Sequence, residues 1–155
     1  MKGTALDKDT IMNRLLVKYI GIFLLLCFEF CPGADSVHTI SGIIKCREKS
    51  TVYLCLTDKK SFQVPFSGVR DTVIDVSDTI SKDVHFTFEN VPSGTYGLRV
   101  FQDTNGNDSL DKGMLGPKEP WTMSWNGKKP LGWPEFRHIC FTITKDSSGI
   151  ILELE

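Results

Sequence analysis

The chain of 155 residues is long enough for one domain with a sizeable core, and its composition is that of an ordinary globular protein, with 24% charged and 41% hydrophobic residues. Its formal net charge of -1 comes without a cluster of Lys and Arg, which excludes the basic surface that nucleic-acid binding requires. We therefore expect one folded domain with no nucleic-acid partner.

Residues 1–36 are typical of a leader followed by a secretory signal peptide. Basic residues precede an apolar run from Tyr19 to Phe28, and small residues follow the run. The run is too short to span a bilayer, so we expect no transmembrane segment in the mature chain. Met12 is a more natural start than Met1. Cleavage after Ser36 leaves residues 37–155 as a mature domain, exported to the periplasm, the cell surface or the medium.

The mature chain contains short apolar or alternating segments separated by Gly, Pro, Asn, Asp and Ser, which is the pattern of strands and turns. From Val84 to Glu89 apolar and polar residues alternate, as in a strand with one face in water. The predicted strands are 40–46, 52–57, 72–76, 84–89, 95–102, 138–144 and 150–153. This pattern predicts an all-β fold, an antiparallel two-sheet sandwich of about seven strands and of immunoglobulin-like or transthyretin-like type. An open barrel is the alternative.

Removal of the signal peptide leaves three cysteines, Cys46, Cys55 and Cys140, so at most one disulfide can form within the chain. If residues 40–46 and 51–56 pair as a hairpin, Cys46 and Cys55 lie about 13 Å apart, too far for a bridge. Any disulfide then involves Cys140. Three buried, reduced thiols are the alternative.

The segment from Asp103 to Asp111 is the strongest functional signal, because it places oxygen donors at positions 1, 3, 5, 7 and 9 of a calcium-binding loop. These donors are Asp103, Asn105, Asn107, Ser109 through its carbonyl, and Asp111. Asp108 stands at position 6, where Gly usually makes the turn, and Met114 stands at position 12, where a bidentate Glu belongs.

The segment before the loop has the alternation of a strand, so the flanking helices of a helix-loop-helix site are absent from the prediction. The remaining ligands must come from elsewhere, and Glu119 is the nearest candidate carboxylate. A metal-free hairpin turn at Asn105-Gly106 is the alternative, since Asx residues also hydrogen-bond their own backbone in loops.

Residues 116–135 interrupt the series of strands with four prolines and all three tryptophans of the chain, Trp121, Trp125 and Trp133. A loop of this length is usually functional or specially packed. Exposed Trp side chains would offer a stacking surface to a sugar ring or a partner protein. Alternatively, the three rings fold inward and close one end of the sandwich.

The motifs of the second half follow a specific order. A Pro-x-Gly-x-Tyr turn at Pro92 to Tyr96 precedes a strand and the Asp/Asn loop, and Pro117-Lys-Glu119 and Ser124 come after it. This order resembles the uncharacterised bacterial family called domain of unknown function 2141. The resemblance implies an exported β-sandwich protein without an established activity.

The resemblance extends to the candidate metal ligands. The residues that match the family's motif are Asp103, Asn105, Asn107, Asp111 and Glu119. Two positions depart from it, because the family commonly has His where Gln102 stands and Gly where Asp108 stands. Any role of that His is therefore lost here, and the loop turn is expected to differ.

Common enzyme motifs are missing from the chain: it has no Gly-x-Ser-x-Gly, no phosphate-binding Gly loop and no His-Glu-x-x-His. Asp103 with Glu119 is a conceivable carboxylate pair for glycoside hydrolysis. The sequence favours an exported non-catalytic module that has a calcium-stabilised loop and binds a glycan, peptide or envelope partner. A purely structural envelope protein with a metal-free loop is the alternative, and a hydrolase acting on envelope polymers is the third candidate.

Overall fold

The computed structural model describes residues 36–76, 83–114 and 116–155. All described residues belong to one compact unit, Ser36–Glu155. Apart from Ser36, the predicted leader and signal peptide lie outside the described residues. Strands dominate the described part, which contains no helix long and apolar enough to cross a membrane.

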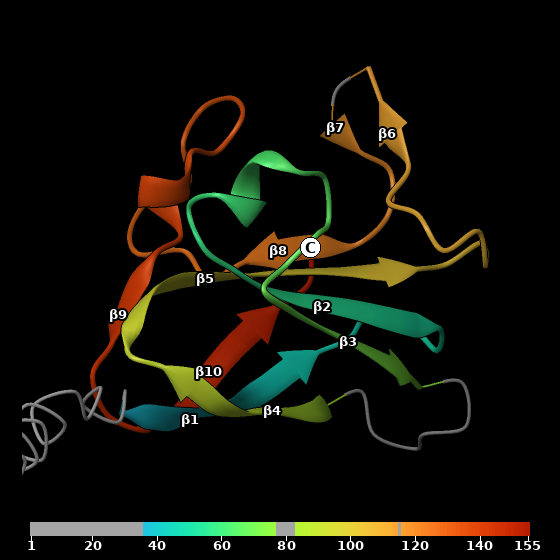
Figure 1. Ribbon diagram of the computed structural model, residues 1–155. Coiled ribbons are helices and arrows are strands. Elements are labelled where there is room, and N and C mark those ends of the chain that lie inside the picture. Colours follow the sequence, from blue (N-terminus) through green and yellow to red (C-terminus); the bar gives the residue numbers. More distant parts are fainter. Residues whose placement is uncertain (1–35, 77–82, 115) are drawn as a thin grey trace, which may run out of the picture. The chain divides into compact units, whose positions relative to one another are not determined.

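One sheet has three strands in the order β10-β1-β4 (Figure 1). Strands β1 (Val37–Lys45) and β4 (Asp83–Pro92) are antiparallel, whereas β10 (Ser147–Glu153) runs parallel to β1. The predicted alternation in β4 is confirmed, because Val84, Phe86 and Phe88 are buried and the residues between them are exposed. This sheet therefore turns one apolar face inward.

The second sheet has five strands in the order β3-β2-β5-β8, with β9 also paired to β5, and all of these pairs are antiparallel. Its strands are β2 (Thr51–Thr57), β3 (Arg70–Asp75), β5 (Gly94–Asp103), β8 (Trp121–Met123) and β9 (Phe141–Ile143). Every residue of β5 from Gly97 to Asp103 is buried, so this central strand is covered on both faces.

The hydrophobic core draws on both sheets. Ile40, Ile44 and Leu152 from the three-stranded sheet join Leu54 and Val100 from the five-stranded sheet in one cluster of buried side chains. A mostly β fold with predominantly antiparallel sheets is thus confirmed; the parallel β1–β10 pair was not foreseen.

Residues 40–46 and 51–56 do not pair as the hairpin considered for the cysteines, because β1 and β2 lie in different sheets. Gln102, which is fully buried on β5, holds the connection between them: its Oε1 accepts a hydrogen bond from the Arg47 N–H at 3.1 Å, and its Nε2 donates to the Glu48 carbonyl. These bonds hold the connection against β5 and so direct the chain into the second sheet.

The predicted strand 138–144 is shorter than expected. A 3₁₀ turn, η2 (Phe136–His138), occupies its start, and β9 covers only Phe141–Ile143. Conversely, the Pro-rich segment contains β8 and the small strand β7 (Gly116–Pro117), which pairs with β6 (Lys112–Gly113).

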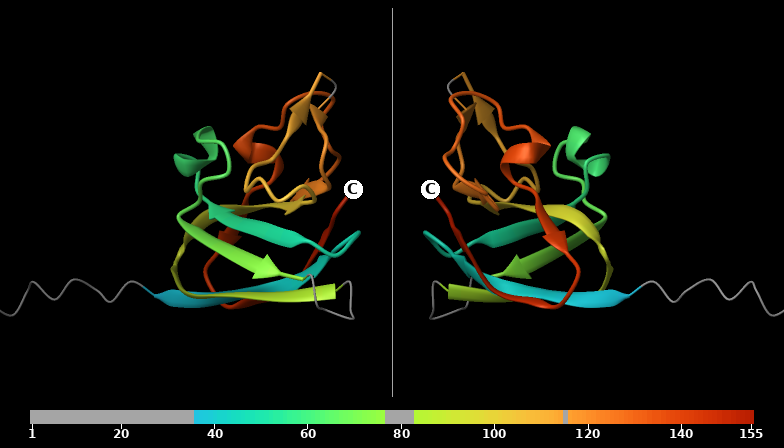
Figure 2. Two further views of the ribbon diagram at one scale, coloured as in Figure 1. Left: turned by 90° about the vertical axis from the view of Figure 1, so that its right-hand side faces the viewer. Right: turned by 90° about the vertical axis from the view of Figure 1, so that its left-hand side faces the viewer.

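Three irregular segments cover the outer face of the five-stranded sheet, the face away from the core (Figures 1 and 2). They are the loop that carries η1 (Ser61–Gln63), the β6–β7 hairpin, and the segment between β8 and β9. The candidate site residues lie in or beside these segments.

Candidate functional site

Asp103, the last residue of β5, organises the Asp/Asn loop from a buried position with 3% exposure. Its Oδ1 accepts hydrogen bonds from the N–H groups of Asn105, Gly106 and Asn107 at 3.3, 2.8 and 3.3 Å, and its Oδ2 accepts one from Asp108 at 2.8 Å. Burial alone would raise the pKa of Asp103, but these N–H donors outweigh it and lower the pKa overall. Asp103 is therefore held as a carboxylate.

Glu119 joins the two ends of the same loop and is likewise buried, with 5% exposure. Its Oε1 accepts a hydrogen bond from the Thr104 N–H at 2.9 Å, and its Oε2 accepts one from the Asp111 N–H at 3.1 Å. Both oxygens of this carboxylate thus hold backbone groups.

Three of the predicted ligands come together at the surface of the loop. The amide nitrogens of Asn105 and Asn107 lie 2.7 and 3.3 Å from the two carboxylate oxygens of Asp111. Their amide oxygens face the backbone instead, where they accept from the N–H groups of Asn107 and Ser109 at 3.1 and 3.0 Å. The three side chains therefore converge, but the two amides present N–H rather than oxygen to Asp111.

The backbone of the loop makes the turn that position 6 requires without a glycine there. Asp108 has a φ of +59°, in the left-handed region that glycine favours, and Gly106 has a φ of +72°. The Tyr53 hydroxyl on β2 donates to the Asp108 carboxylate, which raises the pKa of Tyr53 to about 12. This contact holds the Asp108 side chain against β2, while the Asp108 backbone keeps its positive φ.

The donor set of the loop is that of a hard cation, because it consists of carboxylate and amide oxygens. Among the described residues, however, no group of three or more His, Cys, Asp or Glu side chains is arranged to hold a metal ion. Asp103 and Glu119 are turned to backbone donors, and Met114, at position 12, is almost fully exposed. A cation would bind here only after the Asn105 and Asn107 amides rotate.

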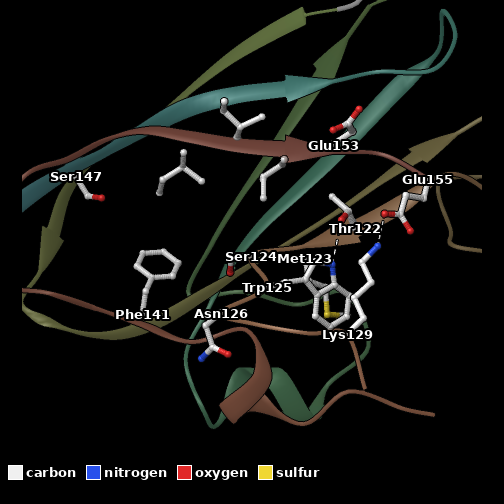
Figure 3. A pocket seen from close by; sticks show the side chains of 13 residues that line it. Thr122, Met123, Ser124, Trp125, Asn126, Lys129, Phe141, Ser147, Glu153 and Glu155 are labelled. Atoms are coloured by element: carbon white, nitrogen blue, oxygen red, sulfur yellow. Dashed lines mark hydrogen bonds and ion pairs between the residues drawn. The ribbon is translucent and has the colours of Figure 1, made fainter. Parts of the chain in front are cut away.

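The three tryptophans line two cavities, although the Trp121 and Trp125 rings touch edge to face with their centres 6.0 Å apart. Trp125 lines a cavity of about 420 Å³ between β8 and β10 (Figure 3), where the Lys129 ammonium lies 5.6 Å from its ring centre and forms an ion pair with Glu155. Phe141 lies toward the other end of this cavity in the same view. Glu155 therefore supplies the counter-charge that Lys129 needs.

Trp121 and Trp133 line a different cavity, of about 190 Å³, on the outer face of the five-stranded sheet. Trp133 is 69% exposed and Trp121 is half-buried, so the rings are neither all exposed nor all folded inward. We call this cavity the outer cleft.

Sequence reasoning missed Arg99, which lies on β5 with 5% exposure and also lines the outer cleft. The sequence feature that could have identified Arg99 is its position as a charged residue inside the otherwise apolar run from Leu98 to Phe101. Such a residue in a strand covered on both faces must be buried, and a buried charge requires partners.

A family model described as an uncharacterised protein conserved in bacteria, domain of unknown function 2141, matches residues 39–150. The chain belongs to this family, as its motifs predicted. No curated protein and no solved structure matches the chain significantly.

Proposed function

From its membership of this bacterial family, we propose that the chain is an exported, non-catalytic binding module whose Asp/Asn loop takes up calcium. The predicted signal peptide supports export to the periplasm, the cell surface or the medium. The two sheets with one shared core support a sandwich of immunoglobulin-like or transthyretin-like type. The partner class is a glycan, a peptide or another envelope component.

The observation that carries the calcium proposal is the convergence of Asn105 and Asn107 on the Asp111 carboxylate. The oxygen and nitrogen of a side-chain amide have nearly the same shape, so a rotation of each amide replaces N–H by oxygen at little steric cost. The bound cation must offset the hydrogen bonds that the two amide oxygens then give up at the Asn107 and Ser109 N–H groups. Calcium would then join two amide oxygens and a carboxylate. Asp103 and Glu119 would keep the backbone of the loop in place during this change.

A structural role with a metal-free loop is the second candidate, and one observation favours it. The polar side chains of the loop already have hydrogen-bond partners without a metal: Asp103 and Glu119 bind backbone N–H groups, and Asp111 binds two amides. Hydrolysis is less well supported, because a general acid needs a raised pKa and that of Asp103 is lowered.

Thermal unfolding with and without calcium distinguishes the first two candidates. We expect a dissociation constant of about 10⁻⁴ to 10⁻³ M, as in other extracellular calcium modules. At 10 mM calcium this stabilises the folded state by about 1.4 to 2.7 kcal/mol, which raises the Tm by about 5 to 10 °C.

The Asp111→Asn variant is the matched control, because it removes one charge and keeps the size of the side chain. It should lose most of the calcium-dependent shift while it unfolds at nearly the wild-type temperature in chelator. No shift of the wild-type protein at 10 mM calcium, or an equal shift in both proteins, contradicts calcium binding and favours the structural role.

A further inference from the structure

The outer cleft combines aromatic walls with positive charge. Phe62, Phe66, Trp121 and Trp133 contribute rings to it, and Arg99 and Lys112 also line it. A second cavity of about 430 Å³ adjoins it and shares Trp121 and Trp133. Because the inner part is smaller than the roughly 300 to 1,000 Å³ of a drug-sized site, it has room for a single ring, with space for a longer molecule outside.

Arg99 is fixed at the base of the η1 loop. Its two terminal nitrogens donate to the carbonyls of Val64 and Ser67 at distances down to 2.6 Å, and its guanidinium lies 5.3 and 5.5 Å from the ring centres of Phe62 and Phe66. Its Nε is buried without a hydrogen-bond partner. The guanidinium is therefore rigidly held but incompletely satisfied.

No carboxylate lines either cavity among the described residues, although the chain as a whole carries a net charge of -1. Asp71 acts on Arg99 only through space, and the neighbouring Cys55 thiol, whose pKa burial raises to about 12, is neutral at pH 7. A buried cation is costly without a paired anion. The positive potential of Arg99 therefore favours an anionic ligand in the outer cleft.

Lys112 brings the second positive charge to the mouth of the outer cleft. It is exposed, and its ammonium lies 5.3 Å from the ring centre of Trp133. Lys129 over Trp125 has the same arrangement, but Glu155 neutralises it. Among the described residues, no ion pair joins Lys112 to an Asp or Glu carboxylate. The outer cleft thus offers a free ammonium beside an exposed ring.

We propose that the outer cleft binds a carboxylate carried by a six-membered ring, with the carboxylate at Lys112 and the ring against Trp133 and Trp121. An acidic sugar of the uronic-acid type and an aromatic acid share this chemistry. The inference rests on the proposed role as a binding module and deepens it by naming the ligand class, but it does not depend on the calcium loop.

Titration of the purified protein, followed by tryptophan fluorescence and calorimetry, tests this inference with four probes. Glucuronate and benzoate carry the carboxylate, and glucose and benzyl alcohol are their neutral counterparts. We expect either acid to bind at least about tenfold more tightly than its neutral counterpart, and increasing salt to weaken that binding. The acid that binds more tightly identifies the source of the ligand as a sugar or an aromatic compound.

Lys112→Gln removes the charge and keeps most of the stem, and Lys129→Gln is its matched control in the other cavity. The first variant should weaken binding of the acid by about fivefold to tenfold, while the second leaves it unchanged. Trp133→Ala should weaken it as well, and because this ring is exposed the variant should fold. Melting temperatures of all variants verify that they are folded.

Equal binding of acids and neutral probes, no binding of any probe, or equal effects of the two lysine variants would overturn the inference. The calcium-dependent shift in Tm is also measured on Lys112→Gln. It separates a failure of this inference from a failure of the proposed function. A normal calcium shift with no selectivity for acids rejects the ligand class alone, whereas acid binding without a calcium shift rejects only the calcium loop.

Discussion

Asp103 and Glu119 serve the loop as acceptors for its backbone. Together their four oxygens take up N–H groups from both ends and the middle of the loop, which a turn of this tightness leaves without partners. The spacing of Asn105, Asn107 and Asp111 on one side of the loop is a local property, so it was predictable. The hydrogen bonds of Asp103 and Glu119 to the backbone depend on the path of the chain, and the spacing of the residues does not predict that path.

The lowered pKa of Asp103 predicts how stability depends on pH. An unfolded Asp has a pKa of about 3.9, and in the folded state the pKa of Asp103 lies lower. The stabilisation is therefore complete above the unfolded pKa and is lost as pH falls through the folded pKa. Asp103→Asn should therefore lower the Tm at pH 7, and the difference from the wild type should shrink at pH 3. A Tm difference that is constant from pH 7 to pH 3 would exclude this linkage.

In the three-stranded sheet, the parallel pair of β1 and β10 joins the first and the last strand of the folded unit. Individual strands were predictable since alternation of apolar residues is local, as in β4. Their partners were not. The β1–β2 connection is fixed by the buried Gln102 side chain from β5, a contact over 55 residues of sequence.

Gly42 is required for the close approach of β1 to β10, because a Cβ at this position would overlap the Ile150 carbonyl oxygen. Gly42→Ala should lower the free energy of unfolding by about 1 to 3 kcal/mol, the range typical of overpacking. Urea denaturation measures this change through the midpoint. Gly127→Ala is the control, because no atom lies within 4 Å of an added Cβ there, and its midpoint should stay near that of the wild type. Equal midpoints for the two variants would contradict the close approach.

At the scale of the whole molecule, the fold protects two of the three cysteines in residues 36–155 and leaves the third accessible. Cys46 and Cys55 are buried, at 6% and 4% exposure, and Cys140 is half-buried near the surface. All three are free thiols in the structure, but only two of them are buried, so the alternative of three buried thiols is met in part. Burial of the cysteines was one of the two alternatives from the sequence, but which of them are buried depends on the packing of the sheets.

Thiol labelling of a protein that comprises residues 37–155 tests this arrangement of the molecule. Burial raises the pKa of both protected thiols, with a contribution from Asp83 at Cys46 and from Asp71 at Cys55, where the pKa reaches about 12. The thiolate is the reactive form, so neither should react appreciably at pH 8. With a thiol reagent that releases a chromophore, native protein should therefore release one equivalent rapidly. The loss of this equivalent in Cys140→Ser assigns it to Cys140. Unfolded protein should release three. Release of only one equivalent after unfolding without reductant would instead show that two of the three cysteines form an oxidised pair.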